Sequence, residues 1–444
     1  AQNLLYINAN LLFCIFRRFL IMNDKIQLKQ DGRFFFGWWI VFLGFCLMLL
    51  AYVGFASLTS VFVIPVTEAL GVGRGEWMLY MTIQALVGVI ASPILGKLMQ
   101  KGSVKKWVAI GCLCGAVAYI IFSQSHSLTG FYIGALFIGV GFVACAPMPV
   151  SILINSWFGG KVKGTASGIA FVGSGLGGFI LSPLLNSAIA AGGYSAGYLV
   201  LAGVYLIILL PMTLLLAVKN PEDKGFRRMG ETEAEVVNDG GALEKRGMTA
   251  GQAMKTGEFW LAIISCIMVV FASSAILMND IGYYVECGID AAKAASYHGI
   301  MLGLLLFGKP IIGFVTDKLG IKVSAPLSTF IFAATFLVMF LFGGSPGILV
   351  AGVCICYCLG APSITVVPPL LVNGMFGEKD YGTLVGYINM ATSIGGAFGA
   401  TIAAFIYDAT GSYVTFWGVA TIGVAIAAVL RIICFAINKK NHNW

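Results

Sequence analysis

Twelve long apolar stretches constrain this chain more than any other feature of its sequence. Each has roughly 20 residues or more, enough at about 1.5 Å per residue to cross a hydrocarbon core about 30 Å thick. Only 10% of all residues are charged, whereas soluble proteins carry about 25%. We therefore predict an all-α membrane protein with twelve transmembrane helices. Their approximate spans are 36–64, 77–99, 107–123, 130–156, 164–190, 195–217, 258–284, 294–315, 324–343, 346–372, 381–406 and 411–436.

The basic residues indicate how the chain is oriented. With the N-terminus in the cytoplasm, the outer loops contain only Arg74 and Lys293 of the 27 Lys and Arg residues, and Lys309 lies within a span. The others lie in or beside inner segments, as the positive-inside rule requires. We therefore expect a monomeric, multi-pass protein of the plasma (inner) membrane with both termini in the cytoplasm. The net charge of +8 follows from this topology, so the expected partner is the lipid bilayer and not nucleic acid.

Other sequence signals argue against a cofactor, a metal or an enzyme. The eleven cysteines lie mostly within spans, and the i, i+2 spacing of several points neighbours to different helix faces. No phosphate-binding GxxxxGK[ST] sequence and no catalytic constellation is present. The residues before Phe34 do not resemble a signal peptide. Either Met22 is the natural start, or this segment forms an interfacial helix anchored by Arg17 and Arg18.

A single long polar segment divides the twelve spans into two sets of six. We expect a cytoplasmic N-terminal segment, two six-helix bundles joined by a cytoplasmic linker, and a cytoplasmic tail. The N-terminal segment covers residues 1–35, and the two bundles cover 36–217 and 258–436. The linker covers residues 218–257, and the tail covers 437–444.

The two sets are internal repeats. "NSWFGGKVKGTASG" from Asn155 matches "NGMFGEKDYGTLVG" from Asn373 at a constant offset of 218, and "PILG" at 93–96 matches "PIIG" at 310–313 at an offset of 217. The second span is thus equivalent to the eighth, and the fifth to the eleventh. Two equivalent bundles can rock about their shared interface and open a central site to alternate sides.

The loop after the eighth span carries a resemblance to a known family. "GFVTDKLGIK", with Gly313, Asp317, Lys318 and Gly320, is similar to the signature loop of the major facilitator superfamily. Its counterpart in the first half is degraded, with Gln100 in place of the acid. We expect Asp317 to face the N-terminal dipole of the following helix, while Lys318 stays cytoplasmic and the glycines permit the turn.

Within that superfamily, "FFGWWIV", "SVFVIPVTEALGVGRGEW" and "WFGGKVKGTASGIAFVGSGLGG" resemble the monocarboxylate transporters and oxalate/formate exchangers. This resemblance implies transport of a small organic anion, bound by a basic residue shortly before the signature loop. Lys309 occupies that place. The chain departs from the pattern in two ways: Leu305 stands where proton-coupled carriers have an acid, and the eleventh span lacks the second cation of dicarboxylate exchangers. Proton symport and anion exchange both stay open.

The residues themselves support a role for Lys309. A charge at the centre of a spanning helix costs roughly 2.5–3.5 kcal/mol, so an intramembrane cation usually faces a cavity. By our count Lys309 is the only basic residue deep in a span, and its repeat equivalent is Ser92. The alternative is that its long side chain reaches the cytoplasmic interface, about 9 Å away at 1.5 Å per residue. A single cation favours a monocarboxylate over a dicarboxylate.

Other polar residues in the spans allow two interpretations each. Tyr52, Gln84, Asn389 and Ser393 could line the substrate cavity or serve as interhelical hydrogen-bonding groups. His298 and Asp280 could couple transport to protons, or lie at a hydrated outer rim. At the level of the whole protein, the alternatives to an organic-anion carrier are a carrier of larger amphipathic or neutral solutes and a transporter-like sensor.

Overall fold

The computed structural model describes residues 29–30, 32–56, 58–230 and 247–441, so the interpretations of Met22, Arg17 and Arg18 fall outside the described residues. The first half begins with an antiparallel pair of short strands, β1 and β2, and continues as helices. Its elements are β1 (Lys29–Gln30), β2 (Arg33–Phe34), α2 (Gly37–Cys46), the π-helical η1 (Leu47–Tyr52), α3 (Val53–Ala56), α4 (Thr59–Leu70), α5 (Arg74–Lys101), α6 (Val104–Gln124), α7 (Leu128–Cys145), α8 (Pro147–Trp157), η2 (Gly160–Val162), α9 (Lys163–Phe171), α10 (Gly173–Gly203), the π-helical η3 (Val204–Leu209) and α11 (Leu210–Leu216).

The second half is helical throughout its described residues. The linker contributes η4 (Pro221–Lys224) and α13 (Ala250–Ala253), followed by α14 (Gly257–Glu286), α15 (Ala291–Gly303), α16 (Leu305–Leu319), α17 (Ile321–Leu341), α18 (Pro346–Gly360), α19 (Pro362–Thr365), α20 (Val367–Phe376), α21 (Tyr381–Thr410) and α22 (Val414–Asn441).

These helices confirm the predicted all-α membrane architecture. Ten described segments are long and apolar enough to cross a membrane. One of them, Lys163–Leu216, contains both the fifth and the sixth span. The two spans are separated at Gly192 and Gly193, where the backbone leaves the helical conformation. The 30-residue helix α21 provides the eleventh span. The last helix continues to Asn441, past the predicted inner end at residue 436.

Two spans of the second half are broken near the middle of the molecule. The eighth span divides at Leu304 into α15 and α16, and the tenth divides at Ala361 and Val366 into α18, α19 and α20. Prolines Pro362 and Pro368 explain the second break, because each lacks a backbone donor at the start of a new segment. Such interruptions are tolerated within a membrane only where protein or water satisfies the freed backbone groups.

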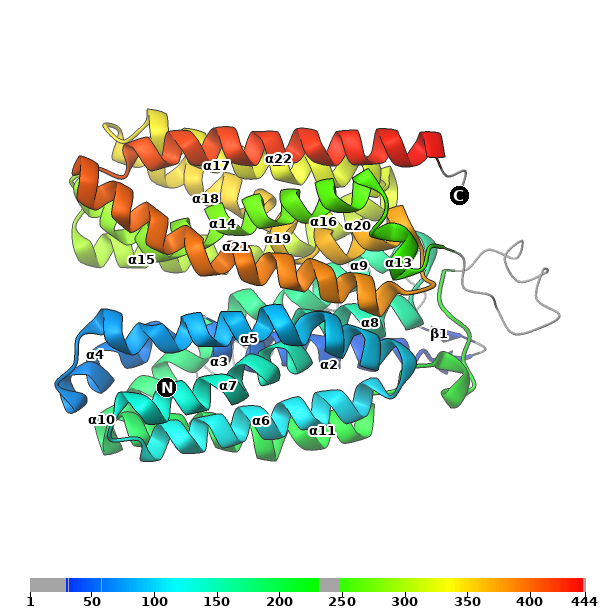
Figure 1. Cartoon of the computed structure of the whole chain (residues 1–444), viewed down its shortest axis with the longest axis horizontal. Coiled ribbons are helices and arrows are strands. Elements are labelled where there is room, and N and C mark those ends of the chain that lie inside the picture. Colours follow the sequence, from blue (N-terminus) through cyan, green and yellow to red (C-terminus); the bar gives the residue numbers. More distant parts are fainter. Residues whose placement is uncertain (1–28, 31, 57, 231–246, 442–444) are drawn as a thin grey trace.

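The two sets of helices form two layers that lie side by side (Figure 1). They meet along two helix pairs, α5 with α21 and α9 with α16. Both contacts depend on glycine: a methyl group on Gly164 would overlap the carbonyl of Gly313, and one on Gly96 would overlap the carbonyl of Gly382. Because Gly96 and Gly313 are repeat equivalents, as are Gly164 and Gly382, the interface is pseudo-symmetric.

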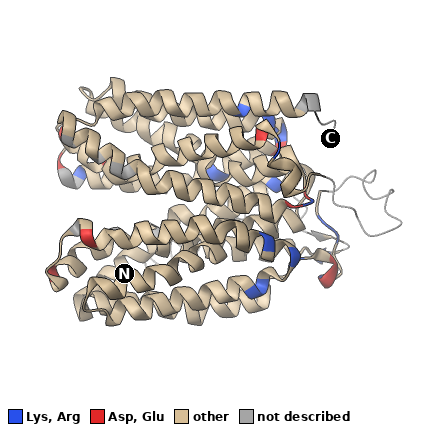
Figure 2. Ribbon diagram, viewed as in Figure 1, with Lys and Arg blue, Asp and Glu red and all other residues tan. Residues whose placement is uncertain are grey.

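Charged residues gather at one end of the helices. Figure 2 shows most Lys and Arg residues at the end where the linker emerges, and few along the middle of either layer. We call this end the linker face, defined by the loops at residues 158–162 and 377–380 together with the linker itself. It is the side that the positive-inside rule assigns to the cytoplasm.

Candidate functional site

Lys309 connects the two bundles in the interior of the molecule. Its side chain is 3% exposed, and Nζ donates to the Phe171 carbonyl oxygen at 3.0 Å and to the Ser174 hydroxyl. The break at Val172 between α9 and α10 frees that carbonyl for an acceptor role. At about 1.5 Å per residue, Phe171 lies roughly 12 Å from the start of α9 at the linker face. The ammonium is therefore directed into the interface, and neither to the linker face nor into an open cavity.

The described residues provide no counter-ion for Lys309. Its two partners are a carbonyl and a hydroxyl, and no described carboxylate forms an ion pair with Nζ. Neutral dipoles compensate only part of the cost of desolvating an ammonium group. An anion at this position would supply the missing charge.

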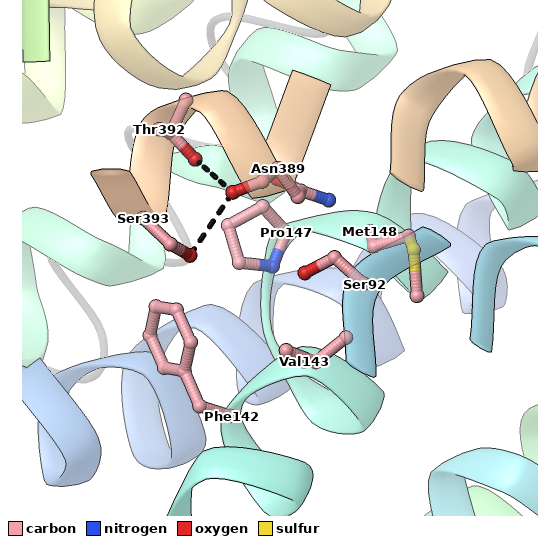
Figure 3. Close-up of a pocket in the computed structure, with 8 residues that line it drawn as sticks. All are labelled: Ser92, Phe142, Val143, Pro147, Met148, Asn389, Thr392 and Ser393. Carbon is pink, nitrogen blue, oxygen red and sulfur yellow. Dashed lines mark hydrogen bonds between the residues drawn. The ribbon is translucent and has the colours of Figure 1, made fainter. Parts of the chain in front are cut away.

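A small polar pocket occupies the pseudo-symmetric position in the other helix pair. Ser92 of α5 is the repeat equivalent of Lys309, and Asn389 and Thr392 of α21 are equivalent to Phe171 and Ser174 at the offset of 218. Serine is too short to fill the space that a lysine side chain fills, and a gap with room for about one water molecule stays there. The pocket is lined by Ser92, Phe142, Val143, Pro147, Met148, Asn389, Thr392 and Ser393 (Figure 3).

The pocket offers neutral hydrogen-bonding groups. The hydroxyls of Thr392 and Ser393 donate to the Asn389 carbonyl of their own helix (Figure 3), and the Ser92 hydroxyl donates to the Gly88 carbonyl of α5. Each of these hydroxyls keeps lone pairs that can accept a hydrogen bond, and the described pocket contains no charged side chain. Of the four neutral residues predicted to line a cavity, the structure places Asn389 and Ser393 in this pocket.

The other two predicted residues belong to the first bundle and do not line the pocket. Tyr52 packs its ring against the pocket residue Phe142, with ring centroids 5.8 Å apart. Gln84 lies eight residues before Ser92, about 12 Å along α5 at 1.5 Å per residue. Its Nε2 donates to the Phe55 carbonyl at 3.5 Å, while its buried Oε1 has no partner among the described residues.

His298 and Asp280 form a pair on the side of Lys309 away from the linker face. His298 Nδ1 of α15 lies 2.7 Å from Asp280 Oδ2 of α14. The Asp280 side chain is 1% exposed and that of His298 is 21% exposed. The sequence marked each residue separately, and the structure places them in one hydrogen-bonded unit.

The signature loop binds the opposite half of the molecule. Asp317 accepts from the backbone N–H groups of Gly164 at 2.7 Å and Thr165 at 2.6 Å, in the first turn of α9. The prediction that Asp317 faces the following helix is wrong: its partner is α9, and not α17. Lys318 lies over the Phe314 ring at 4.5 Å, and Gly320 turns the chain with a φ of 79° that favours glycine.

Gln100 makes the pseudo-symmetric contact in the first half. Its Oε1 accepts from the N–H of Gly382 at 2.8 Å, in the first turn of α21, and its Nε2 donates to the Lys379 carbonyl at 3.3 Å. The degraded first-half motif therefore keeps the same geometry with an uncharged acceptor. One helix N-terminus at the linker face is bound by a carboxylate and the other by an amide.

A cluster of polar residues from both halves and the linker closes this face. We call Asn155, Lys163, Arg228, Asn373 and Glu378 the linker-face clasp. Lys163 donates to Asn155 at 2.7 Å and to Glu378 at 3.1 Å, Arg228 donates to both Glu378 oxygens, and Asn373 donates to Asn155 at 2.9 Å. Burial alone would raise the pKa of Glu378, but the cations of Lys163 and Arg228 lower it to about 2. Repetition of the two asparagines was the only sequence signal for this cluster.

The sequence count also missed a second buried cation. Arg431 of α22 is fully buried. It donates from Nε to the Ser265 hydroxyl at 3.5 Å, from the guanidinium to Thr329, and to the Ser363 carbonyl at 3.3 Å. Lys309 is therefore not the only basic residue deep in a span. These contacts join α22 to α14, α17 and α19 within the second bundle, which is a packing role.

Comparisons with known proteins agree with this architecture. The family model described as Major Facilitator Superfamily matches residues 44–375. The chain is 23% identical over 415 residues to the oxalate:formate antiporter of Oxalobacter formigenes, covering 89% of this chain and 93% of the relative. It is 21% identical over 399 residues to human monocarboxylate transporter 12, covering 85% and 76%. A crystal structure of the E. coli fucose:proton symporter FucP superposes with a TM-score of 0.64 at 17% identity, covering 90% of this chain and 99% of that structure.

Proposed function

Because the chain belongs to the major facilitator superfamily, we propose that it is a secondary active transporter of small organic monocarboxylates, with Lys309 as the residue that binds the carboxylate. The family assignment and the solved-structure likeness confirm the predicted fold of twelve helices in two bundles. The relatives named as an oxalate:formate antiporter and as monocarboxylate transporters favour an organic anion as substrate.

The observation that carries this proposal is the unpaired ammonium between the bundles. Lys309 is buried against a carbonyl and a hydroxyl of the opposite half, and no described acid neutralises it. A substrate carboxylate can displace these neutral acceptors and form a charge-assisted hydrogen bond, which is about twice as strong as a neutral one. Because the contact crosses between the halves, substrate binding would also release one of their connections.

The comparison of the two pseudo-symmetric positions favours a substrate with a single negative charge. Lys309 supplies one cation, whereas the equivalent position in the other helix pair has Ser92 and the neutral pocket around Asn389 and Ser393. A monocarboxylate is neutralised by one ammonium, and its remaining polar atoms would meet neutral groups. A dicarboxylate would leave one charge unmatched in a site of low polarity.

Transport would proceed by alternating access, with the present structure closed at the linker face. The contacts of Asp317 with α9 and of Gln100 with α21, together with the linker-face clasp, hold both halves together there. We propose that these contacts open when the substrate leaves toward the cytoplasm. The same proposal includes a plasma-membrane location, cytoplasmic termini, a monomer, and bundles at residues 36–217 and 258–436 joined by the linker.

Counterflow in proteoliposomes tests this proposal. Liposomes loaded with lactate, pyruvate, formate, oxalate or a bile acid are diluted into the same labelled compound. We expect saturable counterflow of monocarboxylates, reduced at least about tenfold in Lys309→Gln because a charged hydrogen bond contributes about 1.5–3 kcal/mol. Lys106→Gln, which changes an exposed lysine outside the site and the signature loop, is the matched control and should keep counterflow.

Two results would contradict the proposal. Saturable monocarboxylate counterflow retained in Lys309→Gln would reject the binding role of that residue. Binding of a labelled anion by the wild-type protein without any counterflow would indicate a sensor in place of a carrier.

A further inference from the structure

We propose that Asp280 and His298 together form the proton-binding site that couples monocarboxylate transport to a proton gradient. This inference rests on the proposed function and deepens it, because it replaces the choice between symport and exchange with proton symport. It concerns residues that do not contact Lys309 or the neutral pocket in the structure.

The pair lies inside the membrane-spanning part of the protein. Asp280 belongs to the span Gly257–Glu286 and His298 to the span Lys293–Leu319. The carboxylate is 1% exposed, with Oδ2 at 2.7 Å from His298 Nδ1 and Oδ1 accepting from the Ile281 N–H at 2.9 Å. Ionisable residues in spans are costly and usually mark ion or proton pathways. Their mutual hydrogen bond is the arrangement in which a buried acid can keep its charge.

The imidazole is the group in this cluster that can exchange a proton near neutral pH. The other titratable side chains within electrostatic range of Asp280 are Tyr284, Tyr357 and Cys354. Phenols and thiols ordinarily lose their protons only well above neutral pH, whereas histidine titrates between about pH 5 and 8. The 21% exposure of the His298 side chain gives that ring access to water, while Asp280 has almost none.

The geometry indicates where the proton binds. In the unloaded state, His298 is neutral, and its Nδ1–H donates to Asp280 Oδ2. The incoming proton binds to Nε2, which has the free lone pair of this tautomer, and the ring becomes an imidazolium paired with the carboxylate. Release removes the same proton from Nε2, so the hydrogen bond between the two residues persists in both states.

Charge balance explains why this pair would couple to Lys309. The empty site carries the Lys309 cation and the Asp280 anion, a net charge of zero. Binding one monocarboxylate and one proton leaves the net charge at zero again, whereas binding either one alone leaves a net charge in the membrane interior. Such a charge is expensive to move through a low-dielectric region. Half-loaded carriers would therefore reorient slowly.

Two of the three groups that enter this balance, His298 and Lys309, lie in one span, and Asp280 lies in the preceding one. Lys309 follows His298 by eleven residues, or about 16 Å at 1.5 Å per residue, with the break at Leu304 between them. The other buried cation described in this bundle, Arg431, keeps its charge in every state because guanidinium does not titrate in proteins. It is held by Ser265, Thr329 and Ser363 and so contributes equally to the loaded and the empty carrier.

Accumulation against a gradient tests the inference separately from transport itself. Proteoliposomes receive labelled lactate, pyruvate or formate outside, with the outside acidified by one pH unit relative to the inside. We expect wild-type protein to accumulate monocarboxylate toward about tenfold, the limit for one proton per anion. An internal pH dye should report entry of one proton per labelled anion. Asp280→Asn should lose accumulation and keep counterflow, because the Lys309 cation and the bound anion still balance. His298→Gln should lose accumulation and also slow counterflow, because the bound anion then adds to the Asp280 charge, whereas the exposed-loop control His126→Gln should keep both.

The outcomes separate the inference from the proposed function. Wild-type counterflow without accumulation or proton entry would overturn the inference and leave the carrier an exchanger. Accumulation that persists in both Asp280→Asn and His298→Gln would also overturn it. Absence of wild-type counterflow for all three anions would overturn the proposed function and the inference with it. The dye measurement needs only the wild-type protein, so it tests the inference even if a variant fails to fold.

Discussion

At the residue scale, the site is defined by the cation Lys309 and by the uncharged Ser92 at the equivalent position of the other repeat. The sequence identified Lys309 from its position in an apolar run and identified Ser92 as its repeat equivalent. It could not show that Lys309 reaches Phe171 while Ser92 leaves a pocket beside Asn389, because both facts depend on how helices of different halves pack. Arg431 was missed for a related reason. Its position five residues before the predicted span end, at residue 436, fits a side chain that reaches the interface, and only tertiary neighbours show it to be buried.

A lysine at the pseudo-symmetric position should change substrate preference. Ser92→Lys would extend an ammonium into the pocket toward Asn389 and Thr392, as Lys309 extends toward Phe171 and Ser174. We expect counterflow of oxalate to rise relative to formate by at least about tenfold, since a charged hydrogen bond contributes about 1.5–3 kcal/mol. Ser92→Met, which fills the pocket without charge, is the control. Equal oxalate-to-formate ratios in the two variants would exclude a charge effect.

The contribution of Glu378 to the stability of the closed linker face should be lost only in strong acid. Its pKa is lowered to about 2 by Lys163 and Arg228, so its stabilising contribution is complete above the ordinary pKa of about 4.3. That contribution is lost as the pH falls from there through about 2. The shift corresponds to a stabilisation on the order of 3 kcal/mol.

Thermal unfolding in detergent checks this dependence. Wild-type protein should show no contribution from Glu378 to changes between pH 5 and 8, and a fall in apparent Tm below about pH 4. Glu378→Gln should have a lower Tm at pH 7 and a weaker acid dependence. Glu222→Gln, in the exposed part of the linker, should match wild type. Identical profiles for all three proteins would show that the clasp does not contribute to stability.

At the element scale, the helix ends of one half are bound by loops of the other. The sequence predicted a helix N-terminus as the partner of Asp317, and the structure confirms this type of contact. A carboxylate is stabilised there by free backbone N–H groups. The helix was wrong: α9 lies in contact with α16, whereas the sequence favours the adjacent helix. The repeat could have suggested the answer, since Gln100 and Asp317 are equivalent and each precedes a helix of its own half that it does not bind.

Glycines at this helix contact should be required for closing the linker face. In Gly164→Ala the new methyl group would overlap the Gly313 carbonyl, so α9 and α16 would have to separate. We expect a loss of counterflow of at least about tenfold with expression retained, because backbone contacts cannot yield as flexible side chains do. Gly178→Ala, in α10 of the same span, has open space around the new methyl group and should transport like wild type. Normal counterflow in both variants would show that this contact is not needed.

At the scale of the whole molecule, duplication determines both the fold and the closed state. The repeat at offset 218 predicted two bundles, and the structure adds that each repeated loop at the linker face pairs with one end of the linker. Met229 exchanges backbone hydrogen bonds with Trp157 and Gly159, and Met248 donates to the carbonyl of Phe376. Sequence periodicity cannot reveal such pairing, because the linker is outside the repeat and its strand-like contacts are only one residue long.

The two equivalent asparagines of the clasp provide a test of rocking between the halves. Asn155 and Asn373 touch through their side chains at 2.9 Å, although 218 residues separate them. Joining Asn155→Cys to Asn373→Cys with a short thiol cross-linker should hold the linker face closed. Counterflow should then fall in proportion to the cross-linked fraction. Each single variant and the wild-type protein, treated alike, control for the eleven native cysteines. If fully cross-linked protein still exchanged monocarboxylate, the halves would not separate here during transport, and the alternating-access cycle would need another exit.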